Sequence, residues 1–196
     1  MVLAASNRVD KVEGSITAMT KAISTVAGRS RTVTMWTDWE DAMLSESPGL
    51  LMLLAHTVYS PIYRGYGLEI GDDARRWSAN INKSFVPPNG RPVIVALLGC
   101  ETALAGEVGY ELFPSLLRTA AEAEIVIATL TEILGRHAAP LAARLVEELY
   151  RACAEQPLSV GEVLVRLRRR LLRDGLLPVL ALAIYGDAEW LLAKES

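Results

Sequence analysis

The chain lacks the residues and runs on which several classes of protein depend. Only two cysteines occur among its 196 residues, at positions 100 and 153, which is too few for the disulfide framework of a small secreted domain. No apolar run approaches the roughly 20 residues that cross a bilayer. No basic segment precedes the short apolar stretch at residues 1–5, as a signal peptide requires. We therefore expect a cytoplasmic protein with free thiols and no membrane contact.

An excess of one charge and the spacings typical of bound ions or nucleotides are also missing. The net charge is only −3, so the sequence has no strongly basic character that would bind nucleic acid directly. It has no Cys-x-x-Cys or His-x-x-x-His pair for a zinc ion. The first turn after a predicted strand, at residues 6–10, has no Gly-x-Gly for a nucleotide phosphate. We expect neither a metal nor a cofactor.

Apolar residues, 51% of the chain, form short runs that alternate with segments of helical periodicity. The runs predict strands at residues 2–5, 32–36, 50–55, 92–98, 125–130 and 179–185. Helices are expected at residues 15–26, 38–44, 111–123 and 141–153. A last helix should follow a capping box formed by Ser159 and Glu162 and end near Gly175. This alternation predicts an α/β fold, a mostly parallel sheet of about six strands flanked by helices.

One region departs from the alternation. Residues 59–91 are rich in glycine and proline and contain one possible edge strand, at residues 68–70. Clusters of glycine and proline are typical of turns and loops. We interpret the region as a hairpin or flap beside the site, within a single domain of residues 1–196.

Two reactive residues stand where predicted strands end. His56 follows the apolar run at residues 50–55, and Cys100 follows the run at residues 92–98. Sites in open parallel sheets form beyond the carboxyl ends of the strands. Neighbouring strands lie about 4.8 Å apart, so the two side chains can meet if these strands are neighbours. A histidine beside a cysteine is the arrangement of a thiol nucleophile and its base.

These residues carry a resemblance to a known family. The sequence Leu-Leu-Ala-His ending at His56, and Cys-Glu-Thr-Ala beginning at Cys100, resemble the CHAT family of caspase-like peptidases, which share a clan with caspases, separase and the gingipains. Residues 127–131 and 186–190 resemble later segments of that family. The resemblance covers most of the chain and implies a three-layer caspase-like fold with cysteine endopeptidase activity on protein substrates.

The resemblance also implies a role for each residue of the site. Cys100 would attack a peptide carbonyl as a thiolate, and His56 would activate the thiol or protonate the leaving amine. The backbone N–H groups of Thr57 and Cys100 would stabilise the oxyanion. Glu132 stands where separase-like relatives have an acidic residue that reads a basic side chain, which favours cleavage after Arg or Lys. Glu101 and Thr131 are further candidates for contact with substrate.

Two departures keep other function classes open. The family usually has glycine where this chain has Thr57, and tryptophan where it has Thr131. Both substitutions favour a second function class, an inactive caspase-like scaffold that binds proteins. A third class is a doubly wound module that binds a small ligand or nucleotide. Family members in bacteria serve defence and conflict systems beside a sensor module. We therefore expect a regulatory partner of the TPR or ATPase type, with this chain as the peptidase domain alone or as one subunit.

Overall fold

A six-stranded sheet forms the centre of the molecule. The computed structural model describes residues 1–9, 14–99, 113–133, 135–155 and 157–192. The strand order across the sheet is β10-β8-β7-β3-β1-β2. The strands are β1 (Val2–Ala5), β2 (Arg31–Val33), β3 (Leu50–Leu54), β7 (Ile94–Leu97), β8 (Ile125–Thr129) and β10 (Leu182–Tyr185). Every neighbouring pair is parallel except β8 and β10, which are antiparallel. The predicted mostly parallel sheet is confirmed.

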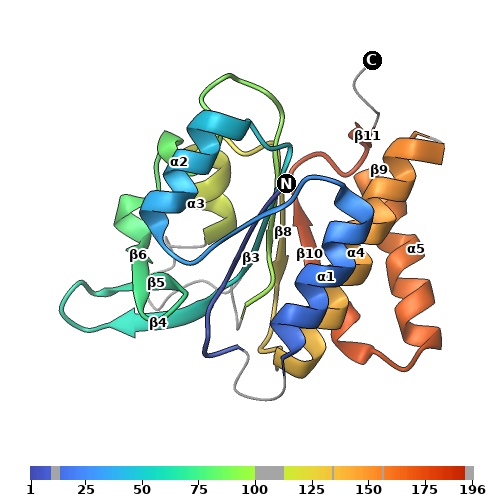
Figure 1. Cartoon of the computed structure of the whole chain (residues 1–196), viewed down its shortest axis with the longest axis horizontal. Coiled ribbons are helices and arrows are strands. Elements are labelled where there is room, and N and C mark those ends of the chain that lie inside the picture. The colour runs from blue at the N-terminus through green and yellow to red at the C-terminus, as the bar shows by residue number, and fades with distance from the viewer. Residues whose placement is uncertain (10–13, 100–112, 134, 156, 193–196) are drawn as a thin grey trace.

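Helices cover both faces of this sheet, as the alternation of elements predicts. One face carries α1 (Ser15–Ala27), α4 (Gly135–Glu155) and α5 (Val160–Arg173), and the other carries α2 (Trp36–Glu46) and α3 (Phe113–Thr119), as Figure 1 shows. Alternate residues of a strand point to opposite faces. Met52 accordingly joins the first core, and Leu51 and Leu53 join the second. The all-apolar run of β3 is therefore explained by burial on both faces.

The capping box at the start of α5 is present. The Ser159 hydroxyl accepts a hydrogen bond from the Glu162 backbone N–H at 3.2 Å, and the Glu162 carboxylate accepts one from the Ser159 N–H at 2.9 Å. These two bonds satisfy backbone donors that a helix start leaves open. The same stretch forms a two-stranded sheet, in which β9 (Leu158–Ser159) pairs with β11 (Leu191–Leu192).

Most of the predicted strands are shorter than expected, and in two of them a helix forms within the predicted run. The run at residues 32–36 is a strand only to Val33, and α2 begins at Trp36, whose ring packs on Trp39 and Phe85. The run at residues 179–185 begins as the 3₁₀ helix η3 (Leu177–Ala181) and becomes a strand only at Leu182. A short apolar run does not distinguish a strand from another buried conformation, and proline favours the first turn of a helix.

The glycine-rich region contains a second, smaller sheet. Its antiparallel strands, in the order β4-β5-β6, are β4 (His56–Ser60), β5 (Gly65–Ile70) and β6 (Ala74–Trp77). The segment predicted as an edge strand, residues 68–70, belongs to the middle strand. The 3₁₀ helices η1 (Ser78–Asn80) and η2 (Lys83–Phe85) follow. Figure 1 shows this small sheet at the lower left, on the side of α2 and α3. Within the described ranges, no helix is long and apolar enough to cross a membrane.

Candidate active site

The carboxyl ends of β3 and β7 lie side by side. The two strands pair in parallel with Leu53 opposite Leu97, and the Leu98 N–H donates a hydrogen bond of 2.7 Å to the Leu53 carbonyl. The condition that these two strands are neighbours is therefore met. Because parallel strands end at a common edge, the chain leaves both strands toward the same side of the sheet, where ligand sites of open α/β sheets form.

His56 is the second residue beyond this edge on the β3 side, after Ala55. It opens β4 and is half-buried, with Glu69 of β5 directly opposite it. Opposite residues of an antiparallel pair project from the same face of their sheet, with Cα atoms about 4.5–5.5 Å apart. The backbone of His56 therefore belongs to the small sheet, shortly after the chain leaves the main sheet.

The β7 side of the edge is described as far as Gly99. That residue is buried, and its carbonyl accepts a hydrogen bond from the hydroxyl of Thr129, which is itself fully buried at the end of β8. Cys100 and Glu101, the next two residues in the sequence, lie outside the described residues. The pairing of His56 with Cys100, the oxyanion role of the Cys100 N–H and the substrate contact of Glu101 all stay predictions.

Thr57 stands where the CHAT family, which the sequence resembles, usually has glycine. It lies within β4, opposite Leu68, and is half-buried. Strand backbone is the conformation that a β-branched residue prefers. A threonine here consequently needs no strained backbone, and its N–H is chemically equivalent to that of glycine. Its oxyanion role stays a prediction.

The residues predicted to read the substrate follow β8, the next strand along the same edge. Thr131 and Glu132 are both exposed. They line an open cavity of about 500 Å³ together with Leu130, Ile133, Leu177, Pro178, Leu180 and Ala181. The cavity combines apolar walls with a carboxylate. That combination suits a side chain with a long aliphatic stem and a cationic end.

The second cysteine lies apart from this edge. Cys153 is half-buried on α4, and burial raises the pKa of its thiol. A thiol with a raised pKa has little thiolate character and reacts slowly. Among the described residues, no three His, Cys, Asp or Glu side chains are grouped so that they could hold a metal ion.

Sequence reasoning missed a charged cluster beside His56. The Glu69 side chain has 0% exposure, and its two carboxylate oxygens form ion pairs with Arg8 Nε at 2.8 Å and with Arg75 Nε at 2.9 Å, the second of which is also a hydrogen bond. Asp73 forms ion pairs with the same two guanidinium groups, at 2.8 and 3.0 Å. The hydrogen bond from Arg8 is the largest of the effects that lower the pKa of the Asp73 carboxyl. The sequence did contain one sign of this cluster, a glutamate between the apolar residues Leu68 and Ile70. A charged residue in a buried strand needs charged partners, so its position could have predicted them.

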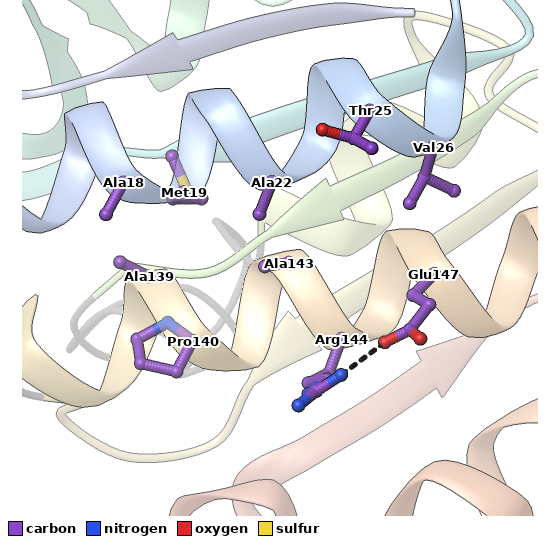
Figure 2. Close-up of a pocket in the computed structure, with 10 residues that line it drawn as sticks. All are labelled: Ala18, Met19, Ala22, Thr25, Val26, Ala139, Pro140, Ala143, Arg144 and Glu147. Atoms are coloured by element: carbon purple, nitrogen blue, oxygen red, sulfur yellow. Dashed lines mark hydrogen bonds and ion pairs between the residues drawn. The ribbon is translucent and has the colours of Figure 1, made fainter.

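A second cavity lies on the far side of the main sheet. It has a volume of about 510 Å³ and separates α1 from α4, where Figure 2 shows small side chains of the two helices facing each other. Its only charged lining residues, Arg144 and Glu147, form an ion pair of 2.6 Å. With no nucleophile or free base in its lining, this groove is not a candidate active site.

Comparison with known proteins supports the fold. No protein-family model matches the chain, and no curated protein sequence is significantly similar to it. The solved structure of gingipain R, an Arg-specific cysteine proteinase, is similar, with a TM-score of 0.60 and 12% sequence identity. The similarity covers 97% of this chain and 46% of the gingipain chain, so this chain spans about half the length of that protein. The chain therefore has a mixed α/β fold that matches the caspase-like fold of gingipain R.

Proposed function

We propose that the protein is a cysteine endopeptidase in which Cys100 is the nucleophile and His56 is its general base. The observation that supports this best is the parallel pairing of β3 with β7. β3 ends at Leu54, one residue before the start of β4 at His56, and β7 ends at Leu97, shortly before Cys100 in the sequence. The thiolate would attack the peptide carbonyl, and the imidazolium would protonate the leaving amine. The N–H groups of Thr57 and Cys100 would stabilise the oxyanion.

The cavity beyond β8 supports a preference for a basic residue before the cut. Glu132 offers the carboxylate, and Leu130 and Leu177, which are 46% and 63% exposed, offer apolar surface for an aliphatic stem. Thr131 and Glu101 would contribute further contacts to substrate. Gingipain R, which has the same fold, is itself Arg-specific. As in the CHAT family, we place this peptidase in a bacterial defence system, regulated by a partner with a sensor module.

Covalent labelling tests the nucleophile and its base. The purified chain is treated with a peptidyl acyloxymethyl ketone ending in Arg, and the intact mass is measured over time. We expect one adduct on the wild type and on Cys153→Ala, the matched control for the second thiol. We expect none on Cys100→Ala, and labelling slowed at least about 100-fold on His56→Ala, since general-base catalysis contributes roughly 10²–10⁴-fold. A wild type that stays unlabelled would instead favour the inactive scaffold.

A second pair of probes tests Glu132. Labelling rates are compared for probes ending in Arg and in Leu. Glu132→Ala should remove most of the preference for Arg, and Glu189→Ala, which removes an exposed carboxylate from the segment that precedes β11, should leave it unchanged. Equal preference in the wild type and in Glu132→Ala would contradict the role assigned to this carboxylate.

A further inference from the structure

The small sheet that carries His56 is joined to the main sheet at the end of β1. The Gly71 N–H donates to the Ala5 carbonyl at 2.8 Å, and the Asn7 N–H donates to the Gly71 carbonyl at 3.0 Å. The Ser6 N–H donates to the Leu54 carbonyl at 2.9 Å. The end of β1 therefore contacts both the last residue of β3 and the turn after β5. His56 lies in the sequence between these two contacts, so the end of β1 restrains the position of its backbone on both sides.

Glu69 adds a side-chain connection at the level of His56. Arg8 and Ser6, which follow β1, bond Glu69 Oε1 at 2.8 and 3.4 Å. Arg75, which lies opposite Glu69 in β6, bonds Oε2 at 2.9 Å. One carboxylate oxygen is thus held from the main sheet and the other from within the small sheet. Ion pairs and hydrogen bonds to a charged group join defined atoms, so they define an orientation more closely than apolar contact does.

The burial of this carboxylate calls for a reason beyond stability. A buried ion pair rarely stabilises a protein more than an apolar replacement would, because both charges lose their hydration. Leu68 and Ile70, the neighbours of Glu69 in β5, are fully buried apolar residues. A buried carboxylate at this position is explained if its ion pairs fix the position of a neighbouring residue. Its cross-strand partner is His56, and catalytic histidines require a precise geometry, since small displacements are costly in rate.

We propose that Glu69 is a positioning residue, and that its ion pair with Arg8 holds β4 so that His56 faces the edge where β7 ends. This role rests on the proposed function of His56. Arg8 provides the connection between the two sheets, and Arg75 provides a connection within one of them. The two arginines are similarly exposed, at 44% and 39%, and both also bond Asp73. Replacing either arginine removes one positive charge from Glu69, but only replacing Arg8 removes the connection between the two sheets. Comparing the two variants therefore distinguishes that connection from the charge balance.

The test compares Arg8→Met with Arg75→Met by two measurements. The first is amide hydrogen exchange across β4, which needs no activity. The second is labelling by the Arg-terminated acyloxymethyl ketone, resolved into the inactivation rate constant kinact and the binding constant KI. For Arg8→Met we expect exchange in β4 to speed up about tenfold and kinact to fall about tenfold, with KI within about twofold of wild type. Arg75→Met should leave both measurements within about twofold, and Arg8→Lys should recover part of kinact.

Several results would overturn the proposal. One is that Arg8→Met changes neither the exchange in β4 nor kinact. Another is that kinact falls equally in both arginine variants, which would indicate that the charge balance around Glu69 matters and the connection between the sheets does not. A parallel change in kinact and KI would indicate general loss of structure. A wild type that reacts with no probe would refute the proposed activity alone, because exchange in β4 would still decide whether Arg8 holds this strand.

Discussion

The two sheets are held by different forces. In the main sheet, every residue of β1, β3, β7 and β8 is buried, and apolar burial of about 25 cal/mol per Å² is the stabilising force. In the small sheet, β5 places Leu68 and Ile70 in the apolar core. Its outer strands β4 and β6 are largely half-buried, and ion pairs with Arg8 and with Glu40 on α2 add to the attachment of this sheet.

The difference corresponds to what each sheet does. Apolar burial is strong but has no direction, which suffices for a platform whose strands end at a common edge. Ionic hydrogen bonds are weaker in net terms but directional, which suits a segment that presents a single histidine. We therefore expect core changes to reduce stability most, and changes in the small sheet to act mainly on its orientation.

Shortening a core side chain should have the largest effect on stability. Leu53 of β3 has 0% exposure, and Leu53→Ala should lower the free energy of unfolding by about 3–4 kcal/mol, because the cavity left behind adds to the lost burial. Urea unfolding followed by circular dichroism measures it. The control is Leu44→Ala, since Leu44 on α2 is 71% exposed and should cost less than about 0.5 kcal/mol. Similar losses for both leucines would mean that the main sheet does not dominate stability.

A smaller but still large effect should come from the turn where the sheets meet. Gly71 has φ of +56°, and a Cβ there would lie 2.3 Å from the Thr34 carbonyl oxygen. Gly71→Ala should cost about 2–3 kcal/mol, from the left-handed backbone and the clash together. Gly90→Ala is the control, because Gly90 has a similar φ of +67° with open space around it, and about 1 kcal/mol is expected. Thermal unfolding of both variants measures the two losses of stability. A larger loss for Gly71→Ala would show that the close approach of the Thr34 carbonyl adds to the cost of the left-handed backbone, and equal losses would show that it does not.

The sequence predicts the main sheet well because its signal is local. A run such as residues 50–55 is apolar at every position, and only a strand covered on both faces explains this in a chain of alternating elements. The run at residues 179–185 has the same composition but is partly a 3₁₀ helix. Hydrophobicity reports burial there and does not report backbone conformation.

The candidate site is predictable only in part, for a related reason. His56 was found because it directly follows a recognisable strand. Glu69 was not, because its partner Arg8, which follows β1, lies 61 positions earlier in the sequence. No local pattern pairs residues so far apart. The contact arises only when β1 and β5 are brought together in the folded chain.

The smallest effect is expected at the second ionic connection of the small sheet, between Glu40 on α2 and Arg76 on β6. The hydrogen bond from Arg76 is the main cause that lowers the Glu40 pKa from its usual 4.5. A lowered carboxyl pKa stabilises the fold above pH 4.5, and this contribution disappears as the pH falls through the folded-state value. Since Glu40 is 40% exposed, Glu40→Gln should cost only about 0.5 kcal/mol at pH 7 and nothing near pH 2. Urea unfolding at both pH values measures this, and Asp38→Asn on the same helix is the control. A cost that persists at pH 2 would show that the side chain acts through packing, and that the small sheet relies less on charge than its contacts indicate.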